Sequence, residues 1–190
     1  MRSPKHPDTI LAMGNLAVTY RILGKYKEGE KLEIQVLDAR KRILGVEHPD
    51  TILTMGNLAV TYGILGKYKE AEKLGIQVLD ARKRILGVEH PNTIFAMANL
   101  AGTYHDLGKY IEAEQLEIQV LDARKRILGV QHPHTILAME NLAVTLRSLG
   151  RYKEAENLVI QSSEVKSSDL GAKSQYTIAT MANTQEAQEK

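Results

Sequence analysis

One sequence unit, repeated four times without a change in length, constrains this chain more than any other feature. The string His-Pro-x-Thr-Ile begins at His6, His48, His90 and His132, so each copy starts 42 residues after the one before it. The copies occupy residues 6–47, 48–89, 90–131 and 132–173, after a lead-in of residues 1–5. A fixed period of this length indicates an array of small modules, each of which buries its apolar surface against its neighbours. The close similarity of the copies fits either recent duplication or deliberate consensus construction.

Each unit carries the signals of two helices. Pro7 and Asp8 suit a helix start, where a missing N–H costs little and a negative charge meets the positive end of the dipole. Apolar residues then recur with helical spacing at Ile10, Met13, Leu16, Ala17 and Tyr20. A turn at Gly24 ends this first helix, helix A, and a second helix, helix B, runs from Tyr26 to a terminating Gly45. The pattern predicts an all-α fold.

Helix B is apolar on two faces. One face holds Tyr26, Gly29, Leu32, Val36, Ala39 and Ile43, and the other holds Ile34, Leu37 and Leu44. One face can cover helix A of the same unit and the other can cover helix A of the next unit. The expected architecture is therefore an α-solenoid of helix-turn-helix repeats, with Leu, Ile, Ala, Val and Met in its core.

Short motifs add a family resemblance. The string NLAxxY from Asn15 to Tyr20 is followed by LGKYxE from Leu23 to Glu28, and the second copy continues with EAE from Glu70. These strings resemble the tetratricopeptide repeat. The 42-residue length and the His-Pro-Asp-Thr start resemble the longer repeats of kinesin light chains and of the C-terminal arrays of fungal and bacterial nucleotide-binding (NLR-like) signalling proteins. The resemblance implies a right-handed superhelix whose concave groove, lined by helix A, binds partner proteins.

Two positions depart from the family pattern. A methionine, Met13 in the first unit, stands early in helix A where the family often has a large aromatic residue. The position midway along helix B, another usual aromatic site, holds Glu33, Gly75, Glu117 and Val159. The packing of 34-residue repeats is therefore not carried over to this position.

The two ends of the array differ. The fourth unit loses apolar residues in helix B, and residues 174–190 resemble the start of a fifth helix A that ends in a polar tail, so we expect a degenerate capping helix there. The first unit has no such cap. This suggests that the chain is a C-terminal piece of a longer protein. The uncapped apolar face of the first unit could instead support end-to-end self-association.

Differences between the copies cluster on one face of helix A. At about 100° per residue, the variable positions of the first three copies span one arc, while Met13, Leu16, Ala17 and Tyr20 lie nearly opposite and are expected in the core. The variable arc is the candidate partner-binding surface, and solvated surface is the alternative for its charged members. The candidates are Leu11, Leu53, Phe95, Val18, Val60, Arg21, His105, Asp106, Glu140 and Arg147.

An asparagine occurs at the edge of this arc in every copy. These residues, the asparagine row, are Asn15, Asn57, Asn99 and Asn141. The resemblance implies that they hydrogen-bond the main chain of a bound peptide, because an amide offers both a donor and an acceptor. A structural hydrogen bond to a neighbouring helix or loop would equally keep the residue unchanged, so both interpretations stand.

Other chemistry finds little support. The repeated histidines lie too far apart to share a metal ion, and His132 and His134 lack a carboxylate or thiol at ligand spacing. The repeated Asp-Ala-Arg-Lys-Arg from Asp38, Asp80 and Asp122 is expected to be a solvated basic ridge at the end of helix B. With a net charge of +2 and no cysteine, signal peptide or membrane-length apolar run, we expect a cytoplasmic protein that binds neither nucleic acid nor membranes.

The predicted function is a non-enzymatic interaction scaffold that binds a peptide or helix of a partner protein, at the ligand-sensing end of a larger signalling protein. No cofactor is expected. An enzyme is disfavoured because the short, repeated loops carry no glycine-rich phosphate loop and no nucleophile with a base. The alternative is a structural, self-associating array or a designed consensus-like repeat protein.

Overall fold

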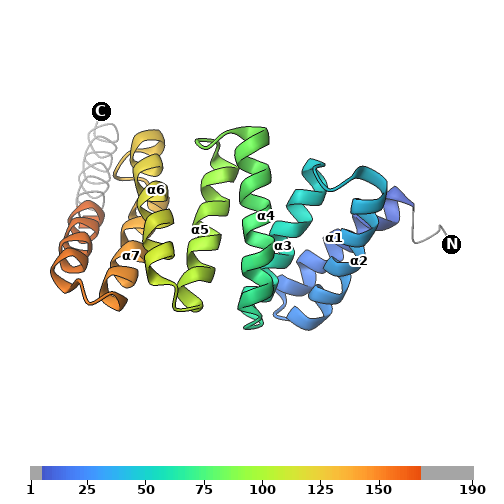
Figure 1. The fold of residues 1–190 in the computed structure, drawn as a ribbon, viewed down its shortest axis with the longest axis horizontal. Helices are drawn as coiled ribbons and strands as arrows, with labels where there is room; N and C mark the ends of the chain where they lie inside the picture. The colour runs from blue at the N-terminus through green and yellow to red at the C-terminus, as the bar shows by residue number, and fades with distance from the viewer. Residues whose placement is uncertain (1–5, 168–190) are drawn as a thin grey trace, which may run out of the picture. The chain divides into compact units, whose positions relative to one another are not determined.

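A computed structural model describes residues 6–167 of the chain. Its labelled helices (Figure 1) are α1 (Pro7–Ile22), α2 (Tyr26–Leu44), α3 (Pro49–Ile64), α4 (Tyr68–Leu86), α5 (Pro91–Asp106), α6 (Tyr110–Leu128) and α7 (Pro133–Ser148). Residues 152–167 form a further helix, and the described part of the chain contains no strand. The alternation of 16-residue and 19-residue helices confirms the predicted helix-turn-helix units. The lead-in of residues 1–5 and the predicted cap of residues 174–190 lie outside the described residues.

The His-Pro strings start every helix A. In α1, the imidazole Nδ1 of His6 accepts a hydrogen bond from the backbone N–H of Asp8 at 3.3 Å, and His48 caps α3 in the same way at 3.1 Å. Each cap satisfies one of the donors that a helix start leaves unpaired. The repeated histidines are thus part of the helix starts.

Glycines end both helices of a unit. Gly24 and Gly45 have φ values of 73° and 90°, in the left-handed region that side chains with a Cβ rarely adopt. After Gly24, the backbone N–H of Lys25 donates to the carbonyl of Tyr20 at 2.8 Å and closes the turn. Helix A is therefore released into a three-residue loop, which brings helix B back against it.

The described chain divides into two compact bodies, the N-terminal body and the C-terminal body, with the boundary between Leu116 and Glu117 inside α6. In the first, each helix from α1 to α5 packs against the next one along the chain. Its core is aliphatic, with buried residues that include Ala17, Val36, Ile52, Leu58, Val78 and Met97. In the second, Val120, Met139, Leu142, Leu146 and Ala155 are buried.

Several residues expected to be covered are exposed. In helix B these are Ile34, Ile43 and Leu44, which are 37%, 50% and 41% exposed. Leu16 is 44% exposed, whereas the equivalent Leu58 is 2% exposed. The difference follows from position, because in α3 this side of the helix is covered by α2, whereas no described helix precedes α1. The Leu16 position of helix A belongs to the core only where another unit precedes it.

The basic ridge is not simply a solvated surface. The guanidinium of Arg40 donates to the carbonyl of Asp50 at 2.9 Å, and Arg82 donates to the carbonyl of Asn92 at 2.7 Å. In the C-terminal body, buried Arg124 donates to the carbonyl of His134 at 2.9 Å. Burial lowers the pKa of Arg82 and of Arg124. The first arginine of each ridge therefore joins helix B to the start of the next helix A, a role that the sequence analysis missed.

Candidate partner-binding surface

A row of apolar side chains lies exposed on helix A. Leu11 of α1, Leu53 of α3 and Phe95 of α5 are each about half exposed. All three are candidates from the sequence. Leu137, at the same position of α7 in the C-terminal body, is also exposed, although the sequence analysis did not select it. Large exposed apolar residues at one position of each helix A are the kind of surface that partners cover.

A pocket of about 220 Å³ opens in the N-terminal body between α1, α3, α4 and α5. Six sequence candidates line it, namely Arg21, Leu53, Asn57, Val60, Phe95 and Asn99. The structure therefore brings residues from three successive copies to one place. The pocket also includes Gly75, Val78 and Arg82 of α4, which the sequence analysis did not select as site residues.

Gly75 is the residue that distinguishes this junction. A Cβ atom added there would lie 3.0 Å from Cδ1 of Leu100, so the position faces directly onto α5. The equivalent Glu33 is 3% exposed, because its side chain fills the corresponding space between α2 and α3. Because Gly75 has no side chain, Leu100 packs directly against the α4 backbone where a glutamate side chain stands one unit earlier. The departure from the family pattern at this position was the signal for it.

The electrostatic character of the pocket is positive. Arg21 and Arg82 line it, and no acidic residue among those described does. Within the described residues neither guanidinium forms an ion pair, although the charge of Arg21 acts on Glu33. The pocket can therefore accept an apolar side chain against Leu53 and Phe95, with a carbonyl or carboxylate oxygen at the guanidinium groups.

The asparagine row is divided by burial. Asn57 and Asn99 are half-buried at the pocket. Asn15 and, in the C-terminal body, Asn141 are exposed. Within residues 6–167 none of the four side-chain amides makes a hydrogen bond. Asn57 and Asn99 thus present unpaired donors and acceptors at the mouth of a pocket.

The remaining candidates do not line this pocket. Val18 is half-buried on α1. The His105 ring makes an edge contact with Tyr110 at a centroid distance of 5.2 Å, and Asp106 is exposed at the end of α5. In the C-terminal body, Glu140 forms an ion pair with Lys166, and Arg147 is exposed in the last turn of α7.

The described residues contain neither a metal-binding cluster nor a membrane-spanning helix. Among the described residues, no group of three or more His, Cys, Asp or Glu side chains is arranged to hold a metal ion. No helix within the same residues is both long and apolar enough to cross a membrane.

Comparison with known proteins agrees with the helix pairs and their motifs. The profile of the tetratricopeptide repeat family matches residues 8–84, 64–126 and 99–168, which together cover most of the chain. The chain belongs to the tetratricopeptide repeat family. Repeats of this family are in general non-catalytic scaffolds for protein–protein interaction. A search of curated protein sequences found no significant match to this tetratricopeptide repeat chain.

Solved structures place the array beside kinesin light chain-like repeats. A single-substitution variant of a putative kinesin light chain from Podosopora anserina, which has nearly identical TPR-like repeats, is 28% identical over 90% of this chain and 80% of that one, with a TM-score of 0.79. A second structure of that protein is 28% identical over 89% and 80%, with a TM-score of 0.76. BtubC from P. vanneervenii has the same fold at 18% identity, covering 87% of this chain and 66% of its own, with a TM-score of 0.79.

Proposed function

We propose that this tetratricopeptide repeat array binds an extended segment of a partner protein across helices α1, α3 and α5. The observation that carries the proposal is the pocket at Gly75, where exposed apolar residues, two unpaired amides and two guanidinium groups converge. Few side chains of a surface dominate most protein interfaces, and these lie in pockets that exclude water. The pocket would supply such an anchor point for a segment that lies along the exposed face of helix A.

Each group would have its own task. A side chain of the partner would enter the pocket and pack against Leu53 and Phe95. The amides of Asn57 and Asn99 would bond the partner's main chain, which is the same for every sequence. Arg82 is already held by the Asn92 carbonyl, so its remaining N–H groups can pair with an oxygen of the partner at little cost in side-chain entropy.

The test starts from a peptide selected on the wild-type chain from a random library displayed on phage. Gly75→Glu restores the residue that Glu33 has in the first copy, and we expect it to fill the pocket and to weaken the selected peptide at least tenfold, about 1.4 kcal/mol, in isothermal titration calorimetry. Ile76→Glu is the matched control, since it adds the same charge at the next, exposed position of α4.

Asn57→Ala and Asn99→Ala complete the set. Each should weaken every selected peptide by about 0.5–1.5 kcal/mol, while the melting temperature stays near that of the wild type. The proposal fails if peptides bind Gly75→Glu as well as they bind the wild type. If instead the asparagine variants unfold the array, the asparagine row is structural.

A further inference from the structure

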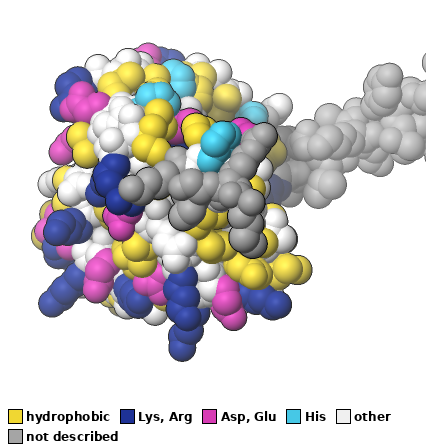
Figure 2. Space-filling view, turned by 90° about the vertical axis from the view of Figure 1, so that its right-hand side faces the viewer, with side chains coloured by type: hydrophobic (Ala, Val, Ile, Leu, Met, Phe, Trp, Pro, Cys, Tyr) yellow, Lys and Arg dark blue, Asp and Glu magenta, His cyan; other side chains and the backbone are white. Residues whose placement is uncertain are grey.

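The start of the described chain exposes a surface that inner units bury. In α3, the side that faces α2 carries the buried residues Thr51, Thr54, Met55, Leu58 and Thr61. The equivalent residues of α1 are Thr9, Ala12, Met13, Leu16 and Thr19, which we call the entry face. Thr9 and Met13 are half-buried, and Ala12, Leu16 and Thr19 are exposed. Figure 2 views this end of the chain and shows hydrophobic side chains open at its surface.

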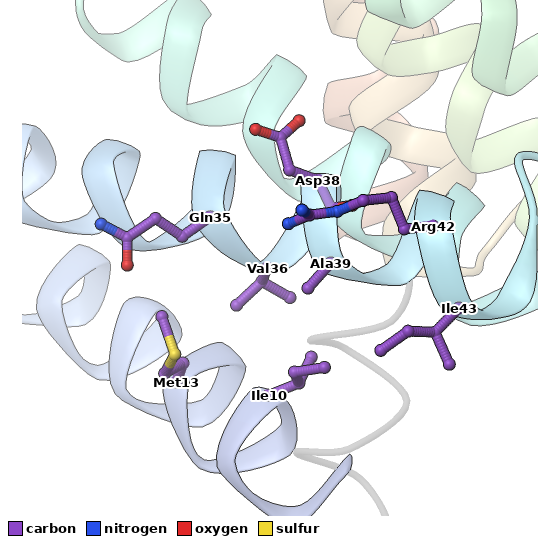
Figure 3. Close-up of a pocket in the computed structure, with 8 residues that line it drawn as sticks. All are labelled: Ile10, Met13, Gln35, Val36, Asp38, Ala39, Arg42 and Ile43. Carbon is purple, nitrogen blue, oxygen red and sulfur yellow. The ribbon is translucent and has the colours of Figure 1, made fainter. Parts of the chain in front are cut away.

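A pocket of about 390 Å³ adjoins the entry face (Figure 3). Ile10 and Met13 of α1 form one wall, and Val36, Ala39 and Ile43 of α2 point toward them from the other. Arg42 lies along its edge. The equivalent arginine, Arg84, pairs with Glu47 at the end of the preceding unit, so this side of a unit is the one that receives a neighbour.

The last described helix, residues 152–167, exposes the complementary surface. Its residues Glu156, Val159 and Ser163, the exit face, are equivalent to Glu30, Glu33 and Leu37 of α2. Glu33 and Leu37 are buried under α3, but Val159 is 44% exposed and Ser163 is also exposed. A helix B that is followed by another helix A has this surface covered.

The junctions between successive repeats in the N-terminal body give the register in which the two faces would meet. At these junctions Glu30 pairs with Lys67 at 2.5 Å, and Glu72 pairs with Lys109 at 2.6 Å. The same register brings Glu156 of one copy to Lys25 of another. It also sets Val159 against Leu16, as Gly75 is set against Leu100.

The charged partners are ready for this contact. Lys25 lies 5.9 Å from the ring centroid of Tyr20, much as Lys67 lies 5.6 Å from that of Tyr62 while it holds Glu30. Within the described residues neither Lys25 nor Glu156 forms an ion pair. The side chain that meets a preceding unit is thus already placed in the first copy.

We propose that copies of this chain associate end to end, with the exit face of one copy docked on the entry face of a second. The contact repeats the junction between consecutive units, and it buries Leu16 and Val159 against each other. Because the two surfaces differ, each copy keeps one free end after a contact forms, and association can continue.

Sedimentation velocity of the wild-type chain from about 1 µM to 1 mM tests the proposal first. The average mass should rise above 21.2 kDa with concentration. Leu16→Asp and Val159→Asp should each remain monomeric, because each removes one face. An equal mixture of the two should form a dimer that does not grow, since one exit face and one entry face remain intact. Leu11→Asp, a change at an exposed leucine on another side of α1, is the control and should associate like the wild type.

Charge reversal gives a second route that leaves the apolar residues in place. Lys25→Glu and Glu156→Lys should each weaken association by roughly fivefold, and mixing them should restore it, because every contact in the mixture can then pair opposite charges. A mass of 21.2 kDa at every concentration overturns the proposal. Undiminished association of Val159→Asp also overturns it, since two entry faces would then be meeting each other.

Discussion

Glu33 carries a carboxyl group into the interface between α2 and α3. Burial raises its pKa above the ordinary value of 4.5, and the Thr61 hydroxyl and the Arg21 charge oppose this shift. The folded chain therefore holds the proton more tightly than the unfolded chain does. Glu33 destabilises the fold fully above its raised pKa, and this destabilisation disappears as the pH falls through that pKa toward 4.5.

Glu33→Gln removes the titration and keeps the shape of the side chain. We expect the variant to be more stable than the wild type at about pH 7, and we expect this advantage to shrink at about pH 5. Urea unfolding at the two pH values measures it, with Glu28→Gln, an exposed change on the same helix, as the control. An equal difference in unfolding free energy at both pH values would show that the carboxyl group is not desolvated.

The two leucines at one repeat position form a natural pair for comparison. Leu58→Ala should cost about 2–5 kcal/mol of unfolding free energy, because it leaves a cavity at a buried site. Leu16→Ala should cost less than about 1 kcal/mol, since its side chain is 44% exposed. Dilute protein is needed for the measurement, so that end-to-end contacts do not cover Leu16. Similar losses for both would mean that the entry face is covered.

At each junction between units, an arginine of helix B donates a hydrogen bond to a backbone carbonyl at the start of the next helix A, and we call this bond the arginine fastening. Arg82→Ala removes the bond to the Asn92 carbonyl and leaves that end of α5 without its donor, so we expect a loss of about 1–3 kcal/mol in chemical denaturation. Arg84→Ala, two residues away, removes an exposed ion pair with Glu47 and should change stability by less than about 1 kcal/mol. If the loss of Arg84 costs more, the half-buried guanidinium of Arg82 does not stabilise the junction.

Helix boundaries were largely predictable from the sequence, because the signals that set them are local. The His-Pro starts and the glycines at the helix ends act within a few residues, and the structure has them where the spacing predicts. The exposure of Leu16 was not predictable in this way, since it depends on which helix precedes α1. The Arg82 fastening was missed because a basic residue in a last turn has an adequate local explanation.

The candidate site was predicted in part. Comparison of the copies identified the exposed face of helix A, and six of its candidates share one pocket. Gly75 and Arg82 were not chosen, because periodicity tells which face a residue occupies and not whether its neighbours fill the space beside it. Leu137 was omitted although its equivalents were selected, so consistent use of the repeat would have found it.

At the scale of the whole chain, consecutive copies should behave as exchangeable segments. Deleting residues 48–89 joins α2 to α5 in the same register, and we expect the shortened chain to fold. Its denaturant m-value should fall by roughly one quarter, because the surface exposed on unfolding falls by one of four units. Circular dichroism in guanidinium chloride measures this. Failure to fold would mean that the junctions are specific to their neighbours.

The arginine fastenings have a consequence for how such an array can change over evolutionary time. Each guanidinium bonds a main-chain carbonyl, and the residues that offer it are Asp50, Asn92 and His134. A carbonyl is present whatever the side chain, so the joint makes no demand on the identity of the residue at its far end. Recombination between copies of the coding sequence can then insert or remove a whole unit in frame, and each new neighbour meets a joint that already fits it.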